Sequence, residues 1–112
     1  MPLPTIQVVN QRKNKTGEYI GRPSPLGNPF SHMPDTLADH KVETREEAIA
    51  AFKMRLESDL RIGKPAVIAE LDRLANIALS TGHLTLRCWC APLPCHGDVI
   101  KEVILNAIKE SQ

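Results

Sequence analysis

The sequence predicts a small single α/β domain, in which a short, mostly parallel or mixed sheet is flanked by helices in the approximate order ββααβα. The chain has 112 residues, which suits one domain with one core, so residues 1–112 are expected to fold as a unit. Short β-branched and apolar runs stand near both ends of the chain, as buried strands require. Between and after these runs, apolar residues recur at the spacing of amphipathic helices.

The composition narrows the functional classes. Apolar residues make up 42% of the chain and charged residues 24%, which is typical of globular proteins and excludes a disordered or fibrous chain. The net charge of +1 gives no global attraction to nucleic acids or membranes, so a nucleic-acid partner is disfavoured. No apolar run reaches the length of a membrane span, and the first residues do not resemble a signal peptide. We therefore expect no membrane partner and a cytoplasmic location.

Two strands are predicted near the amino end. Residues 5–9 are apolar and β-branched, which indicates a buried first strand, and residues 18–20 form a short second one. The basic stretch between them includes Lys13 and Lys15, which we expect at the solvated tip of a hairpin. Residues 31–43 carry little pattern and are expected to form an exposed connection.

The middle of the chain predicts two helices. Thr44 opens a Thr-x-x-Glu capping box that ends at Glu47 and precedes apolar residues at helical spacing. Gly63 is suited to end this helix, Pro65 suits the first turn of the next, and Gly82 is suited to end that one. The expected apolar positions are Ile49, Phe52, Leu56 and Leu60 in the first helix, and Ile68, Leu71, Leu74, Ala75 and Ala78 in the second.

A further strand and a final helix complete the pattern. Residues 83–90 alternate between apolar and polar side chains, which predicts a strand, and residues 91–94 break it. Gly97 and Asp98 are expected to open the last helix, with Asp98 accepting amide hydrogen bonds at its start. The apolar side of this helix comprises Val99, Ile100, Val103, Ile104, Ala107 and Ile108.

The sharpest feature is a cluster of side chains that bind soft metals, namely Cys88, Cys90, Cys95 and His96. Because alternate residues of a strand face the same side, Cys88 and Cys90 should point together. Cys95 and His96 stand just before a helix start, at the edge of an α/β sheet where ligands usually bind. The odd number of cysteines, three within eight residues, argues against a disulfide framework.

Three interpretations of this cluster are open. In the first, Cys88, Cys90, Cys95 and His96 hold one zinc ion as a tetrahedral structural site. In the second, the helix N-terminus and His96 lower the pKa of Cys95, which acts as a nucleophile with His96 as base or acid. In the third, Cys88 or Cys90 packs in the core as a small apolar side chain, which is the expected role of any single cysteine.

The second constellation is the loop from Gly21 to Phe30, which holds three prolines and two glycines and should therefore be stiff. Backbone N–H groups of such a loop can bind an anion, and Arg12 and Arg22 offer planar forks for phosphate or carboxylate. Gly97 would allow a ligand to approach the backbone closely. The candidate ligand-binding residues are Asn10, Arg12, Gly21, Arg22, Ser24, Gly27, Asn28 and Gly97.

These residues resemble a family of bacterial and phage proteins known as domain-of-unknown-function family 4326. The resemblance rests on Val9, Asn10 and Arg12, on the block of residues 19–30, and on the Cys-Trp-Cys and Cys-His-Gly-Asp signature within residues 88–100. It spans nearly the whole chain and implies a compact α/β domain, but it supplies no activity. For a phage-encoded member, the cytoplasm would be that of the host.

The sequence therefore favours a binding site for a nucleotide-like or other anionic small molecule, formed where the 21–30 loop meets the 88–98 segment. If this site is catalytic, which the sequence leaves open, its candidate residues are Cys95, His96 and Asp98. No cofactor other than zinc is expected. In the alternative interpretation, zinc bound by the four residues of the cluster staples a non-enzymatic interaction module.

Overall fold

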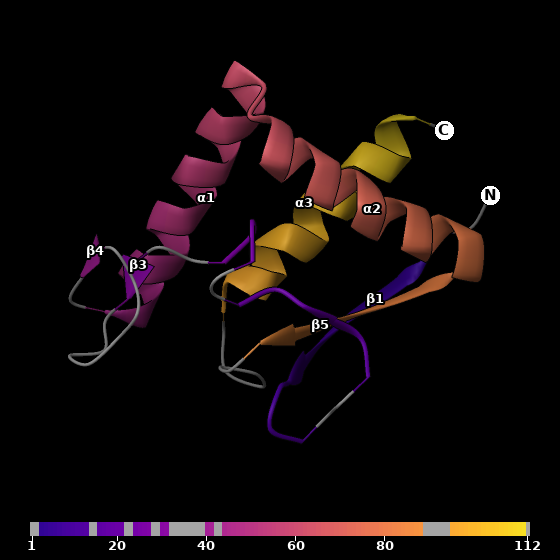
Figure 1. Cartoon of the computed structure of the whole chain (residues 1–112), viewed down its shortest axis with the longest axis horizontal. Helices are drawn as coiled ribbons and strands as arrows, with labels where there is room; N and C mark the ends of the chain where they lie inside the picture. Colours follow the sequence, from indigo (N-terminus) through magenta and orange to yellow (C-terminus); the bar gives the residue numbers. More distant parts are fainter. Residues whose placement is uncertain are drawn as a thin grey trace.

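A computed structural model describes residues 3–13, 16–21, 24–27, 30–31, 40–41, 44–88 and 95–111. The elements, in chain order, are β1 (Thr5–Asn10), β2 (Glu18–Tyr19), β3 (Phe30–Ser31), β4 (His40–Lys41), α1 (Arg45–Ile62), α2 (Pro65–Thr81), β5 (His83–Cys88) and α3 (His96–Glu110). The predicted α/β class and the ββααβα order of the main elements are confirmed (Figure 1). The short parallel pair β3 and β4 adds to this order, where the sequence predicted an exposed connection.

The main sheet is parallel throughout, with β5 between β1 and β2. Asn10 pairs with Cys88, so β1 and β5 end side by side. The predicted hairpin is wrong, because β1 and β2 each pair with β5 from opposite sides and not with each other. Lys13 therefore lies in a connection from one sheet edge to the other, and Lys15 lies outside the described residues. This arrangement brings the carboxyl ends of β1 and β5 to one edge of the sheet.

The two middle helices begin and end where the sequence predicts. Thr44 Oγ1 accepts a hydrogen bond from the amide of Glu47 at 3.1 Å at the start of α1. Gly63 and Gly82 follow α1 and α2 with φ of 75° and 78°, in the left-handed region that favours glycine. Pro65 occupies the first position of α2, where its missing N–H costs no helical hydrogen bond.

The domain has two main layers. Along β5, Leu84 and Leu86 are buried, whereas Thr85 between them is only half-buried. α2 and α3 contact the sheet and each other on the buried face, and α1 packs against both helices (Figure 1). On the opposite face, Gln7 Nε2 donates a hydrogen bond to Thr85 Oγ1 at 3.0 Å. Polar side chains thus pair across the face of the sheet that lies away from the helices.

The core lies between the sheet and the helices. In α3, the predicted apolar residues Val99, Ile100, Ile104 and Ile108 are buried. Of the other two predicted positions, Val103 is half-buried and Ala107 is exposed, so the prediction is wrong at Ala107. In α2, Val67 is buried, whereas the expected core residue Ile68 is half-buried. None of the helices in the described part of the chain has the length and apolarity that a bilayer span requires.

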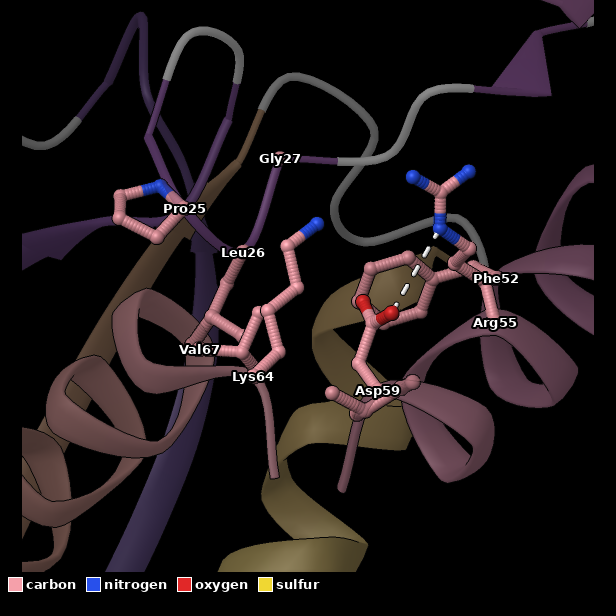
Figure 2. Close-up of a pocket in the computed structure, with 9 residues that line it drawn as sticks. Pro25, Leu26, Gly27, Phe52, Arg55, Asp59, Lys64 and Val67 are labelled. Carbon is pink, nitrogen blue, oxygen red and sulfur yellow. Dashed lines mark ion pairs between the residues drawn. The ribbon is translucent and has the colours of Figure 1, made fainter. Parts of the chain in front are cut away.

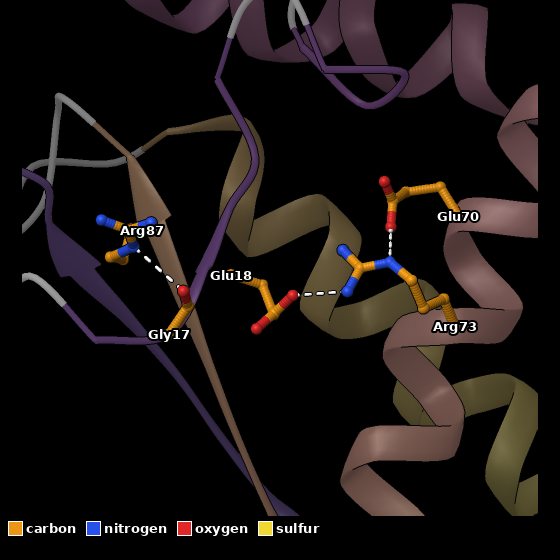
Figure 3. A network of polar contacts seen from close by, with 5 residues as sticks. All are labelled: Gly17, Glu18, Glu70, Arg73 and Arg87. Atoms are coloured by element: carbon orange, nitrogen blue, oxygen red, sulfur yellow. Dashed lines mark hydrogen bonds and ion pairs between the residues drawn. The ribbon is translucent and has the colours of Figure 1, made fainter.

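Polar contacts fix the edge strand β2 from two directions (Figure 3). Arg73 of α2 forms ion pairs with Glu18 of β2 and with Glu70 of its own helix. Arg87 of β5 donates from Nε to the carbonyl oxygen of Gly17 at 3.1 Å. The chain that leaves β2 toward the 21–30 loop therefore starts from an anchored point.

Candidate functional site

The carboxyl end of β5 and the start of α3 bring two of the predicted cysteines together. The Sγ atoms of Cys88 and Cys95 are 3.0 Å apart, and the two residues are 1% and 3% exposed. Cys88 is the last residue of β5, and Cys95 is the N-cap of α3. Cys90, the third cysteine of the cluster, lies outside the described residues, as does Trp89.

The surroundings of Cys95 change its acidity in the direction opposite to the prediction. The hydrogen bond with the Cys88 thiol and the burial of the side chain raise the pKa of Cys95 well above its usual value. The amide of Gly97, 3.3 Å from Sγ, lowers this pKa, but its effect is the smaller one. The expected activation of Cys95 by the helix N-terminus and His96 is therefore wrong for this conformation, because desolvation and the second thiol outweigh the helix start.

The first turn of α3 is held by a capping box. Cys95 Sγ accepts the amide hydrogen of Gly97, and Asp98 Oδ2 accepts that of Cys95 at 3.1 Å. Asp98 thus has the predicted capping function, but the helix begins at His96, one residue before the predicted opening at Gly97. Two of the candidate catalytic side chains, Cys95 and Asp98, satisfy backbone donors at the helix start.

His96 is buried, with 8% of its surface exposed, and faces the chain just after β2. Its Nε2 lies 2.7 Å from the carbonyl oxygen of Ile20. Because a carbonyl oxygen only accepts, Nε2 carries the hydrogen in this contact. The imidazole also meets the ring of Phe52 edge to face, with centroids 5.0 Å apart. His96 thereby joins α3 to the amino end of the 21–30 loop and to α1.

Gly97 is needed for close packing of α3. A Cβ atom at this position would lie 2.8 Å from Val8 Cγ1 and 3.0 Å from Ile20 Cδ1. The close approach that the sequence predicted for Gly97 is thus an approach to β1 and to Ile20 within the core. A ligand contact of Gly97 stays a prediction.

The other predicted ligand-binding residues lie in turns near the sheet edge. Asn10 Oδ1 accepts the amide hydrogen of Arg12 at 2.8 Å directly after β1. The amide of Ser24 donates to the Gly21 carbonyl, and the amide of Gly27 donates to the Ser24 carbonyl, each at 2.9 Å. Arg22 and Asn28 are outside the part of the chain that the structure describes. The two hydrogen bonds make the 24–27 turn a compact backbone unit.

This turn forms one wall of a pocket with a volume of about 180 Å³ (Figure 2). The described residues that line it come from the turn, from α1 and from the start of α2, and comprise Pro25, Leu26, Gly27, Phe52, Arg55, Leu56, Asp59, Lys64 and Val67. Figure 2 shows the side chains of Lys64 and Arg55 extending in the same direction, toward the side of the pocket where Gly27 lies. Arg55 Nε is 3.8 Å from Asp59 Oδ1.

The 21–30 loop thus meets α1 and α2 at this pocket, and none of the described residues of the 88–98 segment is in its lining. The two predicted blocks are connected indirectly. Phe52 lines the pocket and contacts His96, and His96 contacts Ile20 at the start of the loop. Of the predicted ligand-binding residues that the structure describes, only Gly27 lines the pocket.

Sequence reasoning missed the two cations of the pocket, Arg55 and Lys64. On α1, Arg55 reads as an ordinary polar-face residue at helical spacing. Lys64 carries a signal that was available. It occupies the N-cap of α2, between Gly63 and Pro65, where Ser, Thr, Asp or Asn is the stabilising choice.

Comparison with known proteins gives one match. A family model described as Domain of unknown function (DUF4326) matches residues 6–106, from β1 to α3. The match includes the 24–27 turn, the pocket and the Cys88–Cys95 pair. The search of curated proteins and the search of solved structures gave no match.

Proposed function

The chain belongs to the DUF4326 family, whose description assigns no activity, and we propose that it is a binding domain for a small anionic molecule. The observation that carries the proposal is the pocket beside the 24–27 turn, which brings the side chains of Arg55 and Lys64 to one concave surface over the buried residues Leu26 and Phe52. A concave site with a small number of convergent polar groups is a common form of small-molecule site.

The start of α2 adds positive potential to this pocket. α2 has no side-chain cap and no acidic residue in its first turn, and its N-cap is Lys64. A lysine at this end of a helix is unfavourable, because the helix dipole is positive there. An anion in the pocket would offset this repulsion. A lysine at position 64 is then explained by its contribution to binding, although it does not stabilise the helix.

The remaining charges of the pocket favour a small anion over a cation. Asp59 pairs with Arg55, whereas Lys64 has no ion pair among the residues that the structure describes. The volume of about 180 Å³ is below the range of about 300–1,000 Å³ for drug-sized ligands. We therefore expect the pocket to take one part of a nucleotide-like molecule, with its charged group at Lys64.

The proposal commits to binding and not to a reaction. The contacts described for Cys95, His96 and Asp98 include Cys88, the start of α3, Ile20 and Phe52, and a catalytic role for these three residues stays a prediction. Their part in binding would be indirect, since His96 contacts the ring of Phe52, which lines the pocket.

Replacement of Lys64 by serine tests the proposal. The protein is titrated with nucleoside monophosphates and with inorganic phosphate, and calorimetry measures the binding. The Lys64→Ser substitution should weaken the affinity about tenfold or more, which is a loss of about 1.4 kcal/mol of binding free energy. The serine should also cap α2 and raise the free energy of unfolding by about 0.5–1 kcal/mol. Weaker binding by a more stable protein separates loss of the site from loss of the fold.

Lys53→Gln is the matched control, because Lys53 is exposed on α1 and is not among the lining residues. It removes the same charge and should leave the affinity unchanged. Equal affinities of the Lys64→Ser and Lys53→Gln proteins, or no binding of any anion in the series, would refute the proposed site.

A zinc-stapled interaction module is the second candidate, and the approach of Cys88 and Cys95 supports it. Two thiolates on one tetrahedral zinc ion are about 3.8 Å apart, given Zn–S distances of about 2.3 Å. Cys90 and His96 would complete the predicted set, and coordination through His96 Nε2 would require loss of its contact with Ile20. Metal analysis of protein purified without chelator tests this candidate, since one zinc per chain supports it and metal-free, folded protein contradicts it.

A further inference from the structure

We propose that Cys88 and Cys95 form a reversible disulfide, with a low-molecular-weight disulfide as the oxidant. The proposal concerns a redox site at the junction of β5 and α3, and it does not depend on the anion pocket. It rests on the relative placement of the two sulfur atoms, on their burial together and on the position of Cys95 at the helix start.

The geometry favours a bond between these two sulfurs. The Sγ atoms are 3.0 Å apart, so a shift of about 1 Å brings them to the bond length of about 2.05 Å. Cys88 terminates a strand that is paired on both sides, and Cys95 is fixed by the capping box of α3. Both partners are therefore presented by well-ordered elements, which raises their effective concentration relative to the unfolded chain.

Burial restricts the choice of partner. Cys88 and Cys95 are 1% and 3% exposed, so each thiol meets the other and is shielded from other proteins. The same burial favours the protonated thiol at Cys95, which makes oxidation slow without altering the equilibrium between the two end states. We therefore expect an intramolecular disulfide between Cys88 and Cys95 that forms slowly when the oxidant is present.

The reaction is a thiol–disulfide exchange in two steps. One cysteine thiolate attacks the S–S bond of the small disulfide, forms a mixed disulfide and releases one small thiol. The second cysteine thiolate then displaces the other small thiol and forms the Cys88–Cys95 bond. Two S–H bonds of the protein are lost, and the oxidant takes up the two electrons and two protons as two thiols.

The bond would tie the end of β5 to the start of α3. It closes a ring of residues 88–95 that includes Cys90. Because Cys95 Sγ also accepts the amide hydrogen of Gly97, oxidation weakens one cap and replaces it with a covalent link. The neighbouring residue His96 contacts Ile20 and Phe52, and Phe52 lines the pocket, so a shift of the start of α3 on oxidation would be passed to a residue of the pocket lining.

The test uses the full chain with Cys90→Ser, which leaves only Cys88 and Cys95. The protein is equilibrated with a chelator and with mixtures of oxidised and reduced dithiothreitol, both folded and in urea. This reagent is a cyclic disulfide, so it stays attached after the first attack and leaves after the second as one dithiol that carries the two electrons and two protons. Remaining thiols are then alkylated, and the intact mass reports the fraction that carries a disulfide. The urea sample contains the same two cysteines at the same spacing, so it isolates the effect of the fold.

We expect the folded protein to be half oxidised at a ratio of oxidised to reduced reagent at least tenfold lower than in urea. The same ratio in both samples, or a higher one in the folded protein, would overturn the proposal and leave the pair as packed core thiols. In the wild-type chain, a disulfide that uses Cys90 in place of Cys88 or Cys95 would also overturn it, as would bound zinc that protects all thiols until chelator is added.

Discussion

The imidazole of His96 meets the ring of Phe52 edge to face, with centroids 5.0 Å apart and ring planes at 76°. This contact joins the start of α3 to the middle of α1, and the same phenylalanine lines the pocket beside the 24–27 turn. Edge-to-face aromatic pairs add to the stabilisation from burial. The 88–98 segment and the pocket are thus connected by a side-chain contact, even though no described residue of that segment lines the pocket.

Ile104→Ala should lower the free energy of unfolding by about 2–5 kcal/mol, because the substitution leaves a cavity at a buried position. Ile104 is 2% exposed in the centre of α3. Chemical denaturation measures the change. Leu79→Ala on α2 is the control, since Leu79 is 53% exposed and its loss should change stability by less than about 0.5 kcal/mol. Comparable losses in both variants would show that α3 does not carry the core.

Gly97→Ala should destabilise the protein by about 1–3 kcal/mol, although alanine is the better helix former. The added methyl group would lie 2.8 Å from Val8 Cγ1 and 3.0 Å from Ile20 Cδ1. Thermal unfolding checks the sign of the effect. Asn106→Ala, at an exposed position of the same helix, should change stability little and serves as the control. A Gly97→Ala protein that is more stable than the wild type would contradict the close packing of α3 on β1.

Asp98→Ala should cost about 0.5–1.5 kcal/mol, the net contribution of a single hydrogen bond. The carboxylate accepts the amide hydrogen of Cys95 at 3.1 Å and so completes the capping box. Glu102→Ala, one turn further along α3 and exposed, is the matched control. If Asp98→Ala instead abolished anion binding without any loss of stability, the carboxylate would act on the ligand and not on the helix.

The reduced protein should lose stability as the pH rises above about 8.5, the pKa of a free thiol. The contact with Cys88 and burial raise the pKa of Cys95 in the folded state. Above the pKa of the unfolded chain, the unfolded state has released this proton while the folded state still holds it, so folding becomes less favourable. The loss should approach about 1.4 kcal/mol per pH unit and is measured by urea denaturation between about pH 8 and 10.

Cys95→Ser removes the thiol while its hydroxyl can still accept the amide hydrogen of Gly97. Its stability should therefore fall less steeply over the same pH range. The same steepness in both proteins would show that Cys95 is not the group that titrates. At lower pH, where both states hold the proton, the wild-type stability should be independent of this group.

Local signals in the sequence accounted for most element boundaries. Thr44, Gly63 and Pro65 act on the backbone beside them, so their effect is visible without knowledge of the fold. Alternation in β5 identified its buried face for the same reason. The pairing of β1 and β2 with β5 was not visible, because nearby apolar runs separated by a polar stretch fit a hairpin as well as a parallel sheet.

The site was predicted in part. The helix-capping role of Asp98 agrees with the sequence prediction. His96 contacts Ile20, the residue before the 21–30 loop, whereas direct contact of that loop with the 88–98 segment stays a prediction. The acidity of Cys95 was predicted in the wrong direction, since the helix start is a local feature whereas the contact with Cys88 and the burial depend on the tertiary structure. Lys64 could have been recognised as an unusual helix N-cap between Gly63 and Pro65, but its position at the pocket depends on the tertiary structure.

The central place of β5 has a consequence for synthesis of the chain. β1 and β2 are made first, yet each finds its only described partner strand in β5, which lies near the other end of the sequence. The sheet can form only after Cys88 has left the ribosome, while α1 and α2 can acquire their hydrogen bonds earlier. A nascent chain that stalls before His83 therefore lacks β5, the strand with which β1 and β2 pair. We expect chaperones to bind these stalled chains.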